Sequence, residues 1–189
     1  MVTWWWVRHG PTHRGDINGW TDVPADLSDA AALRRLGDFL PADAPVVSSD
    51  LMRAVTTADA IARNRTRLPH VAALREINFG AWEARRAEDI QAEDPALLAD
   101  YFSTPGDIAP PGGESWNDLV RRVNGAVDDL TGMGGDIIAV AHFGPILTQV
   151  QRALGCTAKD AIGHKVAPLS VTRIVIDGTW RLEHVNLLP

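Results

Sequence analysis

A histidine follows an apolar run at two places in this 189-residue chain. The first run ends in Arg8-His9-Gly10-Pro11, and the second ends in His142-Phe143-Gly144-Pro145. Short apolar runs without a helical period are typical of strands buried on both faces, and glycine and proline then turn the chain away. Because ligands bind at the carboxyl ends of strands in open α/β sheets, we expect both imidazoles to lie in one cleft.

Charged residues follow two other predicted strands. Arg53 lies in the first turn of a helix expected over 51–61, which a serine caps after a short strand at 46–47. Glu76 follows a strand expected over 71–74. Taken singly, Arg53 is equally explained as a solvated helix residue, Glu76 as an ion-pair partner of Arg75, and His142 as a core histidine.

Taken together, these residues suit phosphoryl transfer. The planar fork of arginine, here Arg8 and Arg53, binds phosphate oxygens in a bidentate manner. Imidazole can attack phosphorus and leave again, which divides a difficult hydrolysis into two easier steps. A carboxylic acid such as Glu76 can protonate the departing alkoxide.

Several segments, in order along nearly the whole chain, resemble the motifs of the histidine phosphatase superfamily, also called phosphoglycerate-mutase-like. They are Arg8-His9-Gly10-x-Thr12, Ser49-x-Leu51-x-Arg53-Ala54 with Thr57-Ala58, Leu74-x-Glu76 with Phe79-Gly80-x-Trp82-Glu83, Gly112-Gly113-Glu114-Ser115 and Val140-x-His142. The resemblance implies a phosphohistidine at His9, a phosphate held by Arg8, Arg53 and His142, and proton donation by Glu76. We expect Thr12 and Phe143 to belong to the substrate-binding site as well. No metal or other cofactor is implied.

The chain departs from the family pattern at four positions. Gly15 stands where asparagine is usual, Pro11 replaces a common glutamate, and Ala84 follows Glu83 where glycine is typical. Phe143 interrupts the usual His-Gly pair, and we expect it to displace the backbone donor after His142. None of these departures changes the predicted charged positions.

The remaining pattern predicts a three-layer α/β/α sandwich with a mostly parallel mixed sheet. Helices are expected after caps at Ser28 or Asp29, at Asp94 and at Ser115, and a hairpin joins 169–176 to 180–187 through Asp177-Gly178. We expect a single domain over 1–189, with a helical lid inserted at about 79–115. Seven tryptophans are present, and Trp4 and Trp6 should point to one face of the sheet and Trp5 to the other.

Composition limits the classes of partner. The net charge of −6 argues against binding to nucleic acid or an anionic membrane, since both need a basic surface.

His9 and His13 are four residues apart, but Pro11 breaks any helix between them and no third ligand is placed, so we expect no metal site. With a single cysteine and no apolar run approaching 18 residues, we expect a cytoplasmic protein; a homodimer is left open.

Two functional hypotheses from different classes follow. The first is a metal-independent phosphatase that hydrolyses small phosphomonoesters, with a phosphosugar mutase or a protein phosphohistidine phosphatase as subsidiary forms. The second is a degenerate member of the family that binds phosphorylated ligands without turnover. A mutase needs a second cationic cluster, whereas the segment 79–115 contains only Arg85 and Arg86 among many acids.

Overall fold

The computed structural model describes all residues, 1–189, and its centre is a five-stranded sheet in the order β2-β3-β1-β4-β5. Strands β1 (Val2–Arg8), β2 (Val46–Ser48) and β3 (Gly135–Ala141) run parallel. Strand β4 (Val171–Ile176) pairs antiparallel with both β1 and β5 (Trp180–Leu187). The sheet is therefore mixed and mostly parallel, as the sequence predicts.

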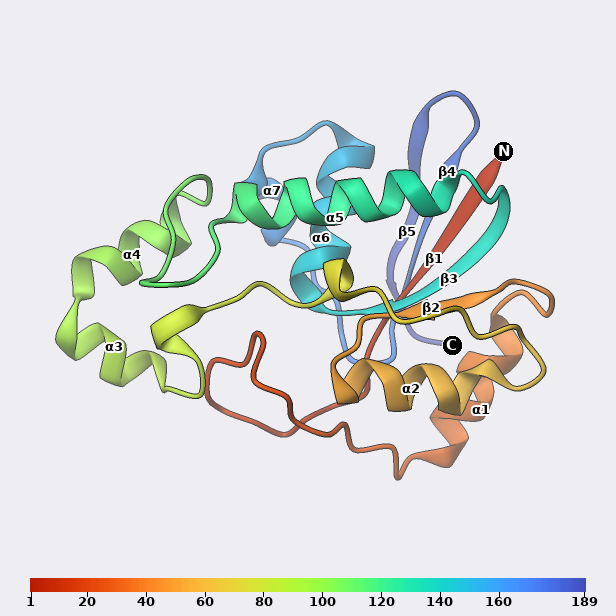
Figure 1. The fold of residues 1–189 in the computed structure, drawn as a ribbon, viewed down its shortest axis with the longest axis horizontal. Helices are drawn as coiled ribbons and strands as arrows, with labels where there is room; N and C mark the ends of the chain where they lie inside the picture. Colours follow the sequence, from red (N-terminus) through yellow and green to blue (C-terminus); the bar gives the residue numbers. More distant parts are fainter.

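Helices cover both faces of this sheet (Figure 1). Helices α1 (Ala30–Phe39) and α2 (Met52–Ala62) pack on one face through a cluster that includes Val7, Leu36 and Ile61. Helices α5 (Trp116–Thr131) and α6 (Phe143–Leu154) pack on the other face, and the short helix α7 (Ala158–Ile162) follows α6. The predicted three-layer architecture is confirmed.

The tryptophans of β1 show why its apolar run specifies a central strand. Trp4 and Trp6 are fully buried on the α5–α6 side, where their rings stack with centroids 5.0 Å apart. Trp5 points to the opposite face and meets Phe39 of α1 edge-on. A strand buried on both faces needs apolar side chains at consecutive positions, and β1 supplies them.

Most predicted element boundaries are confirmed. Side chains of Asp29, Asp94 and Ser115 cap α1, α4 (Pro95–Ser103) and α5, and Ser115 forms a reciprocal capping box with Asp118. The predicted hairpin joins β4 to β5, with Gly178 at a φ of +94° that glycine adopts readily.

The predicted strand over 71–74 is wrong, since Ala72–Leu74 forms a short 3₁₀ helix, η1. The preceding segment does run beside β2, with hydrogen bonds from Leu68 to Val46 and from Val71 to Ser48. Val46 and Arg67 form an isolated parallel bridge, and the pairing does not extend into a ladder before the chain turns into η1. Glu76 therefore follows a turn of helix rather than a strand.

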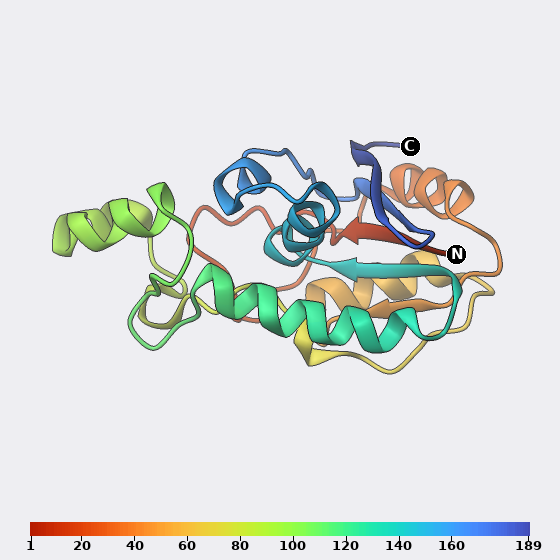
Figure 2. The ribbon, with the colours of Figure 1, turned by 90° about the horizontal axis from the view of Figure 1, so that it is seen from above.

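The segment 79–115 projects from one end of the sandwich, as both views show (Figures 1 and 2). It contains a second 3₁₀ turn, η2 (Gly80–Trp82), and two short helices, α3 (Ala87–Glu93) and α4. We call this segment the lid. No helix of the structure is long and apolar enough to span a membrane.

Candidate active site

The two predicted histidines lie side by side at the carboxyl ends of β1 and β3. The backbone N–H of His9 donates to Ala141 O at 3.0 Å, which continues the strand pairing to the last residue before His142. The His9 and His142 rings have centroids 5.0 Å apart, and both are buried. The sequence predicts this convergence, and the adjacency of β1 and β3 explains it.

His9 is held as a neutral imidazole with one nitrogen free. Its Nδ1 lies 2.7 Å from Gly10 O, and a carbonyl oxygen only accepts, so Nδ1 carries the proton and Nε2 carries the lone pair. Burial lowers the pKa of His9 to about 3; the Gly10 hydrogen bond opposes this shift, and the charges of Arg53 and Arg8 add to it. A neutral, oriented imidazole is the form that can attack phosphorus.

Backbone carbonyls orient both arginines. Arg53, in the first turn of α2, donates from Nη1 to Thr21 O at 2.9 Å and from Nη2 to Gly19 O at 2.6 Å. Arg8 donates from Nη1 to Val166 O at 2.6 Å. Neither guanidinium has a carboxylate as a hydrogen-bond partner, so the pair is suited to an anion.

Glu76 is buried beside these cations but does not form the ion pair with Arg75 that would make it structural. Arg75 instead binds Asp50, through hydrogen bonds of 2.7 and 2.5 Å. Burial raises the pKa of Glu76, although the Ile77 N–H, Arg53 and Arg8 pull the other way. A carboxyl group whose pKa is raised by burial is a candidate general acid.

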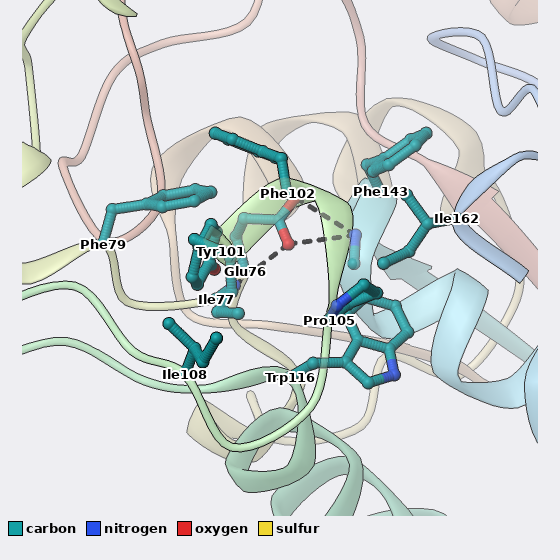
Figure 3. Close-up of a pocket in the computed structure, with 11 residues that line it drawn as sticks. Glu76, Ile77, Phe79, Tyr101, Phe102, Pro105, Ile108, Trp116, Phe143 and Ile162 are labelled. Carbon is teal, nitrogen blue, oxygen red and sulfur yellow. Dashed lines mark hydrogen bonds between the residues drawn. The ribbon is translucent and has the colours of Figure 1, made fainter. Parts of the chain in front are cut away.

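The backbone donor after His142 is displaced by one residue but is not lost, because the glycine after Phe143 supplies it. Gly144, in the first turn of α6, donates its N–H to Glu76 Oε1 at 3.0 Å (Figure 3). A Cβ at Gly144 would lie only 2.4 Å from that oxygen, so only glycine fits here. The extra residue shifts the glycine by one position, and the helix start brings its N–H to the carboxyl group.

Ser49 has a different role from the predicted one. No side chain caps α2, and Ser49 Oγ instead lies 2.7 Å from His142 Nε2 and accepts weakly from Leu51 N–H at 3.4 Å. The Ser49 hydroxyl can donate to Nε2, and in that tautomer the proton of His142 is on Nδ1. That Nδ1 is buried and has no protein partner, as expected for a group that awaits a ligand.

The sequence analysis assigned no role to Glu83, which the structure shows to organise a loop of the site. Glu83 accepts from the backbone N–H groups of Gly19, Trp20 and Thr21, from Thr21 Oγ1 and from Phe79 N–H. These bonds fix the loop whose carbonyls hold Arg53. The sequence did contain a signal for this role, because Glu83 belongs to the segment Phe79-Gly80-x-Trp82-Glu83 that resembles a family motif.

The structure places Phe143 near the charged residues, and Thr12 and His13 in the loop that follows Gly10. Phe143 opens α6 and its ring lies 5.5 Å from the Arg8 guanidinium carbon, so it does reach the site. Thr12 is partly exposed in the loop beyond Gly10, and its assignment to substrate binding stays a prediction. His13 turns outward to Asp26, 2.8 Å away and exposed.

Comparison with known proteins agrees with this arrangement. The chain is 34% identical to the "Bifunctional protein Rv2228c" of Mycobacterium tuberculosis, over 95% of this chain and 52% of that protein, and thus spans about half of that relative's length. It is 25% identical to a "Probable phosphoglycerate mutase GpmB" of Proteus mirabilis, over 86% of this chain and 76% of the relative. The solved structure of a mycobacterial glucosyl-3-phosphoglycerate phosphatase, Rv2419c, with VO3 is 26% identical, with a TM-score of 0.82 over 97% of this chain and 98% of that one.

The family is decided by the match over almost the entire chain. Residues 4–188 fit the model of the "Histidine phosphatase superfamily (branch 1)", and this range includes every charged residue of the site described above. This chain belongs to the histidine phosphatase superfamily.

Proposed function

We propose that this protein is a metal-independent phosphatase that hydrolyses small phosphomonoesters through a phosphohistidine at His9. One observation carries the proposal: His9 is neutral with Nδ1 committed to Gly10 O, beside two cations whose charge no carboxylate pairs directly. This arrangement supplies both a nucleophile and a binding site for a dianion.

In the first step, His9 Nε2 attacks phosphorus and the bond from phosphorus to the ester oxygen breaks. Arg8, Arg53 and Nδ1–H of His142 bind the nonbridging oxygens, where charge develops. Glu76 transfers its proton to the departing oxygen, so the alcohol leaves neutral. Burial raises the pKa of Glu76, which favours the protonated form that this step requires.

In the second step, water attacks the phosphohistidine. The Glu76 carboxylate left by the first step accepts a proton from this water, and the bond between Nε2 and phosphorus breaks. Inorganic phosphate and neutral His9 result, and Glu76 is protonated again. No other reactant is required.

Hydrolysis is favoured over phosphoryl transfer to a second substrate by the charges of the lid. Arg85 binds Glu93 at 2.6 Å and Arg86 lies 3.8 Å from Glu88, so both lid arginines near the site have acidic partners. A mutase must bind a bisphosphorylated intermediate and exclude water from it. The similarity to a probable phosphoglycerate mutase makes the mutase the second candidate.

The test is rapid quench with a ³²P-labelled phosphomonoester in the presence of EDTA. We expect an acid-labile, base-stable phosphoenzyme in the wild type and none in His9→Ala. Label trapped in His9→Ala would refute the assignment of the nucleophile. Binding of inorganic phosphate with neither phosphoenzyme nor turnover would instead identify the degenerate, non-catalytic form.

A second assay separates the two enzyme candidates. With 3-phosphoglycerate as substrate, we expect release of inorganic phosphate whether or not 2,3-bisphosphoglycerate is added. Formation of 2-phosphoglycerate that depends on the bisphosphate and outpaces phosphate release would favour the mutase.

A further inference from the structure

An apolar pocket opens directly beside the Glu76 carboxyl group (Figure 3). Its walls come from the lid, from the start of α5 and from the α6–α7 region. Eight of its eleven lining residues are hydrophobic. The side chains that form the walls are Ile77, Phe79, Tyr101, Phe102, Pro105, Ile108, Trp116, Phe143 and Ile162.

The pocket has almost no means of binding a charged group. Glu76 is its only acidic residue, and no lysine, arginine or histidine lines it. The Nε1–H of Trp116 donates to Gln151 Oε1 at 2.7 Å, so the ring offers the pocket only its apolar surface. Arg85 and Arg86, the cations that the lid contributes, do not line the pocket.

Two residues connect the pocket to the phosphate site. Glu76 lines the pocket, and a general acid must contact the ester oxygen that it protonates. Phe143 also lines the pocket, and its ring lies 5.5 Å from the Arg8 guanidinium carbon. A group attached to the ester oxygen therefore extends from the phosphate, past Glu76, into the apolar walls.

The outer wall is exposed in the absence of a ligand. Phe102, on the lid helix α4, has 56% of its surface exposed, although most large apolar side chains of this chain are buried. An exposed phenyl ring beside an open apolar pocket loses water contact when an apolar ligand binds, which favours binding.

We propose that this pocket binds the leaving group, and that the substrates are phosphate esters of apolar alcohols, either aryl or alkyl, rather than of sugars or hydroxy acids. The inference rests on the proposed phosphatase activity and specifies its substrate class. A carboxylate in the pocket would lie beside Glu76 without a counter-charge, and the several hydroxyls of a sugar would find only the Tyr101 hydroxyl and Glu76 as side-chain partners.

The first experiment measures kcat/KM for phosphate release along the series ethyl, butyl, hexyl and octyl phosphate. Each methylene transferred from water to apolar walls should raise kcat/KM by about fourfold until the pocket is filled. We expect phenyl and hexyl phosphate to exceed glucose 6-phosphate and 3-phosphoglycerate by at least about tenfold. A flat chain-length series, or faster turnover of the sugar and acid phosphates, would overturn the proposal.

A charge introduced at the pocket mouth provides the second experiment. Phe102→Arg should raise the ratio of kcat/KM for 3-phosphoglycerate to that for hexyl phosphate by about tenfold, since it supplies the missing counter-charge and removes an apolar wall. Phe39→Arg is the matched control, because Phe39 is 42% exposed on α1, whose contacts are with α2 and β1 and not with the pocket. An equal change of the ratio in both variants would refute the role of Phe102.

A binding measurement separates failure of this inference from failure of the proposed function. Alkylphosphonates of the same chain lengths cannot be hydrolysed, and calorimetry gives their Kd without turnover. Affinity that rises with chain length supports the pocket even if no ester is hydrolysed, in which case only the phosphatase proposal fails. Affinity independent of chain length overturns the pocket assignment even if His9-dependent hydrolysis is observed.

Discussion

The phosphate site and the lid pocket lie against each other but are built in opposite ways. Arg53 is 2% exposed and His142 is fully buried, and each has a named hydrogen-bond partner from the loops or strands around it. The pocket wall depends on short helices and a proline-containing loop, and Phe102 is 56% exposed. We therefore expect the proposed chemistry to depend on the sheet and its flanking loops, and selectivity to depend on the exposed side chains of the lid.

This contrast predicts that single changes in the phosphate site have large effects on every substrate, whereas changes in the lid mainly alter selectivity. The predictions below test this contrast, beginning with changes in the phosphate site and ending with a change in the lid.

Arg53→Ala should reduce kcat/KM by about 10²–10³-fold or more, as expected when a preorganised donor to the transition state is removed. Steady-state kinetics with phenyl phosphate and p-nitrophenyl phosphate measure the loss. Met52→Ala is the matched control, since Met52 is adjacent in the same helix turn and 45% exposed. Similar losses in both variants would show that the helix start, and not the guanidinium, is responsible.

Glu76→Gln should reduce kcat/KM for an alkyl phosphate by about 10²–10⁴-fold, the range typical of general acid catalysis. With p-nitrophenyl phosphate the loss should be small, because nitrophenolate leaves without a proton. Equal losses on both substrates would exclude the acid role.

The pH profile follows from the same residue. Burial raises the pKa of Glu76, so the protonated acid is present at low pH and is lost as pH rises through that raised value. Wild-type activity on alkyl phosphates should therefore decline on the alkaline side, and Glu76→Gln should lack this limb. On the acid side, the low pKa of His9, about 3, keeps the nucleophile neutral throughout the usual assay range.

Glu83→Gln should lower kcat/KM by about 10–100-fold through displacement of Arg53, since small misplacements of a catalytic group can cost this much. The new amide NH₂ would face the N–H donors that now converge on the carboxylate. Hydrogen bonds from Thr21, Phe79 and Trp20 hold the Glu83 pKa below its usual value despite the opposing effect of burial, so the carboxylate form is the one the loop needs.

The readout that distinguishes positioning from stability is the Kd of inorganic phosphate, which should weaken in Glu83→Gln. Glu88→Gln, fully outside this loop on α3, should leave the Kd unchanged. A lower melting temperature without a change in the Kd would mean that Glu83 stabilises the fold only.

Arg85→Ala should have the smallest effect, within about twofold in kcat/KM for phenyl phosphate, because it removes only an exposed ion pair with Glu93. The same assay with 3-phosphoglycerate checks whether Arg85 attracts anionic substrates. A tenfold loss of kcat/KM for 3-phosphoglycerate would show that the lid contributes to phosphate binding. The contrast between the two regions would then be wrong.

The sequence predicted correctly those features that depend on residues close together in the chain. The apolar runs before His9 and His142 predict two central strands because consecutive apolar residues fit only a strand buried on both faces. The caps at Asp29, Asp94 and Ser115 are equally local, since one side chain binds a backbone N–H three residues away. The family motifs predicted that Arg53 and Glu76 belong to the same site as the two histidines.

Tertiary structure alone decided the interactions between distant segments. The segment expected as a strand over 71–74 contains a 3₁₀ turn, and Ser49 bonds to His142, 93 residues away, rather than capping its own helix. Glu83 accepts hydrogen bonds from a loop more than 60 residues earlier in the chain. The N–H of Gly144 reaches Glu76 because α6 starts where the carboxyl group is buried. These hydrogen bonds depend on which elements the sheet order β2-β3-β1 brings together, and no local periodicity records that order.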